Sequence, residues 1–95
     1  MNACVIFDVS VRLMDVKAAL KQMGYWASWS GAGTIYNLPG NSLWKPNCEL
    51  KQAKNDIQSV IANLNLGNPA NPIVLQRCVV LQVNPWEGFP GEAIL

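Results

Sequence analysis

Residues Ala3–Ser10 read ACVIFDVS, and this stretch decides the fold that the sequence predicts. Five apolar residues run from Ala3 to Phe7 without a polar break, and Asp8 follows them. A short, uninterrupted apolar run is typical of a strand that is buried on both faces, so we expect it at the centre of a sheet. Asp8 then stands where the strand ends and the chain turns toward a helix.

Two segments have the apolar spacing of amphipathic helices. The first has an apolar stripe of Leu13, Val16, Leu20 and Met23, and Gly24 ends it. The second begins near Asn47, a good N-cap, and stops near Gly67, where prolines follow. On the polar sides of the two helices we expect solvated charges: Asp15, Lys17, Lys21, Lys51, Lys54 and Asp56.

Three further segments have the composition of strands. Tyr25–Ser30 and Thr34–Leu38 flank a turn at 31–33 and together predict a hairpin. Ser42–Pro46 reads as a short extended link, and Ile73–Val83 as the last strand. The order β-α-β-β-α-β predicts an α+β, ferredoxin-like domain: one four-stranded antiparallel sheet with both helices on one face. The other face would meet water or a second subunit.

Composition favours self-association over nucleic-acid binding. The 95 residues form one domain, and only 14% of them are charged, against about 25% in an average soluble domain. Four Trp residues and a net charge of +1 suggest apolar surface that a second copy covers, and they show no basic footprint for nucleic acid. The sequence contains no stretch typical of a membrane span or signal peptide. Three cysteines without a paired motif fit core thiols in a reducing cytoplasm.

Asp8 is the sharpest candidate for chemistry. Two such aspartates, one from each subunit of a dimer, would offer oxygen ligands to a divalent cation such as Mg²⁺. The alternative is that Asp8 caps the loop or helix that follows. The chain has no His, so it lacks the commonest general base and the commonest metal ligand. We therefore expect no catalytic residue, no cofactor and no metal, with Asp8 as the alternative for catalysis and for metal.

Aromatic residues are the candidates for an interface. Trp26 and Trp29 fall in a predicted strand, where they could stack nucleobases or pack against a second subunit. Residues 84–95 form a C-terminal arm whose prolines oppose helix, and whose Trp86, Phe89, Ile94 and Leu95 are too apolar for a free tail. The sequence predicts that the arm docks on a neighbouring subunit rather than on its own, with Trp86 as a lid over its own core as the alternative.

The element order and the step Ile6-Phe7-Asp8-Val9, with a helix ending at Gly24, resemble a known family. It comprises the small CRISPR-associated proteins of the spacer-integration complex and their toxin-like relatives. The resemblance implies a ferredoxin-like fold, dimers across the open sheet face, and the family's aspartate at Asp8. Some members cleave nucleic acid with a metal at that position, and others only bind duplex DNA. This chain has only Arg12 where the family has several basic residues after the aspartate.

These observations predict a homo-oligomeric interaction or binding module without catalytic activity, whose partner is another copy of itself. The first alternative is a metal-dependent nuclease or nucleic-acid-binding scaffold, which the charge does not favour. A further alternative is a small-molecule binder in an apolar cavity between subunits. The predicted interface residues are Trp26, Trp29, Trp86 and Phe89.

Overall fold

The central strand, β1 (Ala3–Val9), lies between two antiparallel neighbours in the computed structural model, which describes residues 1–83 and 86–92. The three-stranded sheet has the order β4-β1-β5, with β4 at Ser42–Lys45 and β5 at Leu75–Gln82. The central position predicted for the apolar run is therefore confirmed. Its burial on both faces is not, because Ile6 is 38% exposed.

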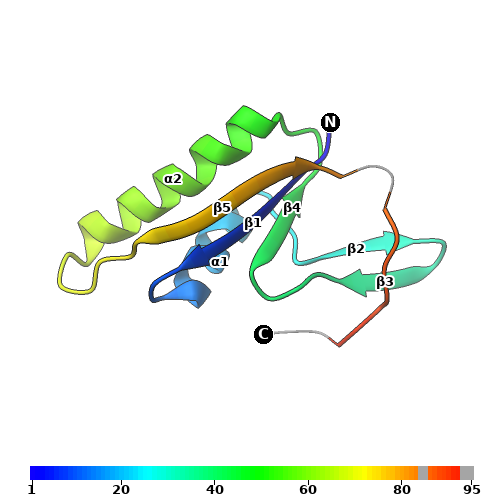
Figure 1. The fold of residues 1–95 in the computed structure, drawn as a ribbon, viewed down its shortest axis with the longest axis horizontal. Coiled ribbons are helices and arrows are strands. Elements are labelled where there is room, and N and C mark those ends of the chain that lie inside the picture. Colours follow the sequence, from blue (N-terminus) through cyan, green and yellow to red (C-terminus); the bar gives the residue numbers. More distant parts are fainter. Residues whose placement is uncertain (84–85, 93–95) are drawn as a thin grey trace.

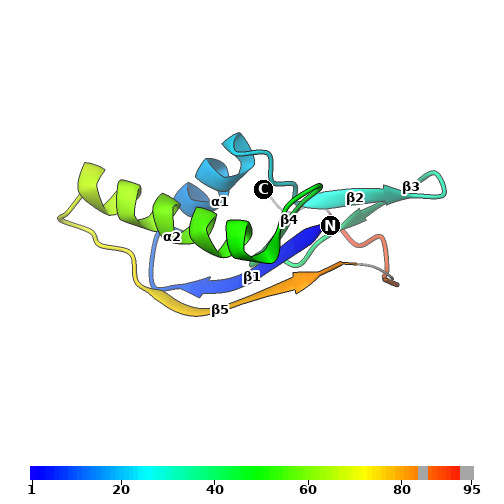
Figure 2. The same ribbon diagram turned by 90° about the horizontal axis from the view of Figure 1, so that it is seen from above.

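Two helices cover one face of this sheet. α1 (Leu13–Gln22) and α2 (Leu50–Gly67) both lie on the same side of β1 and β5, as Figure 2 shows. Alternate residues of β1 point to that side, and Phe7 packs there with Leu20 and Ile57 in the hydrophobic core. α2 begins later than predicted, since Asn47 adopts a left-handed φ of 50° outside the helix.

The remaining strands form a separate hairpin. β2 (Ser28–Gly31) pairs with β3 (Thr34–Asn37), and both residues of the connecting turn, Ala32 and Gly33, have positive φ. This is the geometry of a tight two-residue hairpin turn, which matches the twist of the strands it joins. The hairpin projects away from the three-stranded sheet (Figure 1).

The predicted single four-stranded sheet is therefore wrong. Thr34–Asn37 pairs only with its hairpin partner, and the place beside β1 is taken by β4, which the sequence suggested was a link. An isolated antiparallel bridge pairs Trp44 of β4 with Trp26, which precedes β2. Over residues 1–83 and 86–92 the structure is an α+β fold with two helices, a three-stranded sheet and a two-stranded sheet.

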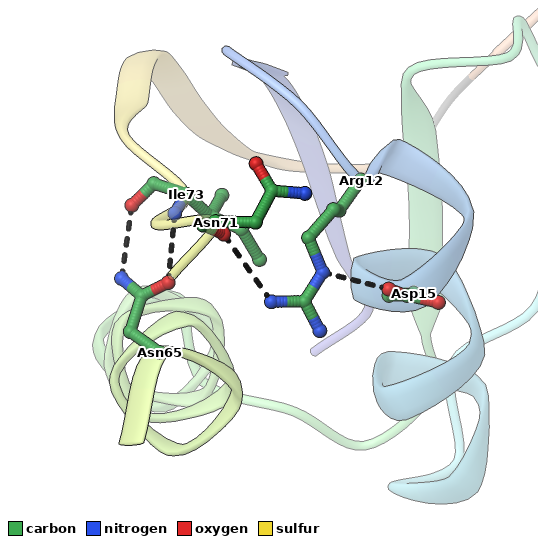
Figure 3. A network of polar contacts seen from close by, with 5 residues as sticks. All are labelled: Arg12, Asp15, Asn65, Asn71 and Ile73. Atoms are coloured by element: carbon green, nitrogen blue, oxygen red, sulfur yellow. Dashed lines mark hydrogen bonds and ion pairs between the residues drawn. The ribbon is translucent and has the colours of Figure 1, made fainter. Parts of the chain in front are cut away.

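A polar network fixes the point where β5 begins (Figure 3). Asn65 on α2 uses its side-chain amide twice, accepting from the Ile73 N–H at 2.7 Å and donating to the Ile73 carbonyl at 3.0 Å. Arg12, left-handed at φ 60°, donates to Asp15 at 2.8 Å and to the Asn71 carbonyl at 3.4 Å. The loop before β5 is thus held to both helices.

Candidate interaction surface

The face of the three-stranded sheet that carries no helix is the candidate functional surface, and we call it the open face. Ile6 of β1 points to it, and the strand register places Val79 of β5 directly opposite Ile6 and Leu81 opposite Cys4. Val79 is 53% exposed and Leu81 48%. Three neighbouring aliphatic side chains on two strands are therefore half in water, which is the arrangement expected of a surface that another molecule covers.

The open face continues onto β4 and the strand-like residues beside it. Trp44 lies opposite Cys4, and Trp26 lies opposite Trp44 with two backbone hydrogen bonds of 2.8 and 3.0 Å between them. Side chains directly opposite one another share a face of the sheet, so Leu81, Cys4, Trp44 and Trp26 form one row across it. Trp26, a predicted interface residue, is 59% exposed at the end of this row.

Asp8 lies at one end of the open face and is engaged by basic and amide groups. Arg77 Nε donates to Asp8 Oδ2 at 2.7 Å, and Asn41 Nδ2 donates to Asp8 Oδ1 at 3.3 Å. The hydrogen bond from Arg77, and then that from Asn41, lower the pKa of Asp8. The carboxylate holds an arginine of the neighbouring strand and does not cap the following loop or helix.

The described residues offer Asp8 little help with a metal. Among residues 1–83 and 86–92, no group of three or more His, Cys, Asp and Glu side chains is placed to hold a metal ion. The Arg77 guanidinium already neutralises the Asp8 carboxylate. A divalent cation at Asp8 would have to displace it. The geometry therefore gives the nuclease alternative no support of its own.

Three of the predicted interface residues lie at or near an aromatic cluster beside the open face. Trp29 of β2 packs against Trp44, with ring centroids 5.5 Å apart, and against Trp86 of the arm at 4.8 Å. Trp86 also meets Tyr36 edge-on at 4.8 Å. Phe89 remains 91% exposed. Trp29 and Trp86 therefore make contacts within the chain, and of these three residues Phe89 alone is left almost wholly free for a partner.

The described part of the arm docks on its own hairpin. The Pro90 carbonyl accepts from the Asn37 N–H at 2.9 Å and from Asn37 Nδ2 at 3.2 Å. A Cβ added to Gly31 would lie 3.2 Å from the Trp86 ring, so the glycine permits this close approach. The prediction that the arm would dock on a neighbouring subunit is thus not what this chain shows; Ile94 and Leu95 lie outside the described residues.

A buried polar network behind the sheet was missed by sequence reasoning. Asp56 of α2, expected to be solvated, is buried and accepts from Tyr25 Oη at 2.8 Å and from Gln52 Nε2 at 2.7 Å. Burial and the hydrogen bond to Asp56 raise the pKa of Tyr25. Lys17, also expected in water, is buried, and this burial lowers its pKa. The network links Tyr25, which directly precedes Trp26, to α2.

Comparison with protein families, with curated proteins and with solved structures found no match for this chain. None of the helices in the described part of the chain is long and apolar enough to cross a membrane. The function must therefore be argued from the surface itself.

Proposed function

We propose that this chain is a homo-oligomeric interaction module without catalytic activity, and that copies associate through the open face. The observation that carries the proposal is the cluster of half-exposed Ile6, Val79 and Leu81 on a sheet face without helices. Fully burying an exposed aliphatic side chain contributes on the order of 1.5–3 kcal/mol, and covering the exposed part of these half-buried side chains contributes roughly half of that each. A two-fold contact would bury each of the three twice.

The same proposal includes a ferredoxin-like arrangement of the strands. The order β5-β1-β4, followed by the Trp26 bridge on the far side of β4, supports the strand order of that arrangement. In this interpretation the strand next to β4 is reduced to the single bridge at Trp26, and the β2–β3 hairpin is an insertion between Trp26 and β4.

The test is the mass of the protein in solution. We expect sedimentation at micromolar concentration to show a dimer or larger species, and Val79→Glu to shift it to the 10.4 kDa chain, because a carboxylate cannot be buried unpaired on this face. Leu66→Glu is the matched control: Leu66 is 81% exposed on α2, away from the open face. A wild-type protein that sediments only at 10.4 kDa would overturn the proposal.

A further inference from the structure

The outer edge of β5 leaves a row of backbone groups without partners in the described structure. In an antiparallel ladder, the N–H and C=O of successive residues point to opposite sides of the strand. Phe7 donates its N–H to Asn41 on the β4 side at 3.0 Å, so Ile6 turns toward β5, and its partner Val79 turns toward β1. The residues of β5 on either side of Val79 therefore point outward.

Three residues of β5 beyond its bulge have this outward direction: Cys78, Val80 and Gln82. β5 pairs with β1 alone in the part of the chain that the structure describes, so these outward backbone groups have no neighbouring strand to bond to. The row from Cys78 to Gln82 spans about 13 Å, since a strand rises about 3.3 Å per residue. The strand itself carries little that would block pairing at this edge: it contains no proline and no lysine, and its bulge lies at its start, beside Asp8 and Val9. Its one charge, on Arg77, is paired with Asp8.

A groove of about 600 Å³ runs along this edge, between β5 and α2. Figure 1 shows α2 alongside β5 on the side away from β1, and Figure 2 shows that α2 belongs to the helix layer. The apolar lining includes Leu50 and Ile57 from the helix, and Cys78 and Val80 from the strand. Lys51 and Lys54 also line the groove, and no carboxylate does.

We propose that the β5–α2 groove binds an extended acidic peptide segment of a partner protein, which adds to β5 as a further strand. Backbone groups of the peptide would pair with the three outward residues, and this main-chain pairing supplies affinity in known cases of strand addition. Side chains on one face of the peptide would enter the groove, where an apolar residue meets Val80 and acidic residues meet Lys51 and Lys54. The groove lies on the helix side of the sheet, so this binding goes beyond association through the open face and does not depend on it.

A second copy pairing through the same edge fits less well. A two-fold pairing of β5 with β5 would bring the α2 helices of both copies together at the axis, because α2 lies beyond β5 in Figure 1. Lys51 and Lys54 of each copy would then face a surface of the same charge. A single extended strand needs far less room, and an acidic one complements the groove.

The probe is the peptide acetyl-Glu-Thr-Val-Thr-Glu-Thr-amide, whose Glu and Val side chains share one face of an extended strand. We expect it to bind at least tenfold more tightly than the same peptide with Lys in place of Glu. In ¹⁵N-labelled protein it should shift the amides of Cys78, Val80 and Gln82, and it should slow alkylation of Cys78 by N-ethylmaleimide. The double variant Lys51→Glu, Lys54→Glu should reverse the preference between the two peptides, while Lys21→Glu on α1 should not.

Backbone methylation of the probe tests strand addition directly. Methylating the amide nitrogens of alternate residues gives two isomers, and only one set of amides can face β5. We expect one isomer to lose at least tenfold in affinity and the other to bind normally. Equal binding of both isomers, equal binding of the Lys peptide, or no binding at millimolar peptide would each overturn the proposal. Repeating the titration with Val79→Glu separates this result from that of self-association, because that substitution lies on the opposite face.

Discussion

Replacing Tyr25 by phenylalanine removes one oxygen atom from the core and leaves a buried carboxylate short of a donor. Tyr25 Oη donates to Asp56 Oδ2 at 2.8 Å, and both residues are buried. A hydrogen bond to a charged group is worth about 1.5–3 kcal/mol, and the ring itself stays in place. We therefore expect Tyr25→Phe to lower the free energy of unfolding by about 2 kcal/mol and the melting temperature by about 10 °C.

Urea unfolding followed by circular dichroism measures this change. Tyr36→Phe is the control, because the Tyr36 hydroxyl makes no hydrogen bond in the described structure and that substitution should cost less than about 0.5 kcal/mol. A double-mutant cycle with Asp56→Ala should give a coupling above about 1 kcal/mol. A Tyr25→Phe protein as stable as wild type, or a coupling near zero, would refute the role of this network.

The same variant should change the alkaline limb of stability. The pKa of Tyr25 is raised in the folded protein, first by burial and then by the hydrogen bond to Asp56. A raised pKa means that the folded state keeps its proton when the unfolded tyrosine, with a pKa near 10, has lost it. The stability from Tyr25 is thus fully present below about pH 10 and falls above it. Tyr25→Phe should flatten this fall, and urea midpoints between pH 9 and 11 would show it.

Two further predictions concern Asp8, at the end of β1, and Ala32, in the turn between β2 and β3. The pKa of Asp8 is lowered in the folded protein, chiefly by its hydrogen bond from Arg77. Its contribution to the free energy of unfolding is therefore present above the unfolded pKa near 4 and is lost as the pH falls. Asp8→Asn should flatten the loss of stability between pH 5 and 3 in urea titrations, and an unchanged slope would contradict the ion pair. Ala32 has a left-handed φ of 50°, a strained conformation for a residue with a Cβ; Ala32→Gly should raise the free energy of unfolding by about 0.5–1 kcal/mol, and a loss of stability would contradict this.

The sequence predicted the elements of this fold better than their pairing. Apolar spacing indicated both helices, and the apolar run of β1 indicated the central strand, because each pattern is local. The sequence predicts Ser42–Pro46 as a link, since so short a segment with a lysine and a proline has little periodicity, whereas the structure has β4 at Ser42–Lys45. What makes it a strand is its antiparallel register with β1, from Ala3 opposite Lys45 to Ile6 opposite Ser42, and no local pattern carries that information.

The candidate site shows the same division between local and tertiary information. The element order predicts a sheet face without helices, and the alternation of side chains along a strand places Val79 and Leu81 on one face of the predicted strand Ile73–Val83. Asp56 was assigned to water because an aspartate on an amphipathic helix is usually solvated, and only the docking of Tyr25 against α2 explains its burial. The sequence does not predict the partner of Asp8 either, because Arg77 is distant in sequence and only the strand register places it opposite Asp8.

Adjacent residues of β5 serve the two proposed surfaces separately. Val79 points to the open face, whereas Cys78 and Val80 line the groove beside α2, since side chains alternate along a strand. The backbone divides in the same way. The N–H and C=O of Val79 point toward β1, whereas those of Cys78 and Val80 point toward the outer edge of the sheet. We therefore expect a substitution at Val79 to weaken the proposed self-association without affecting the groove, and one at Val80 to do the reverse. A protein in which both substitutions abolish both kinds of binding would show that the two surfaces are coupled through the strand, contrary to the geometry.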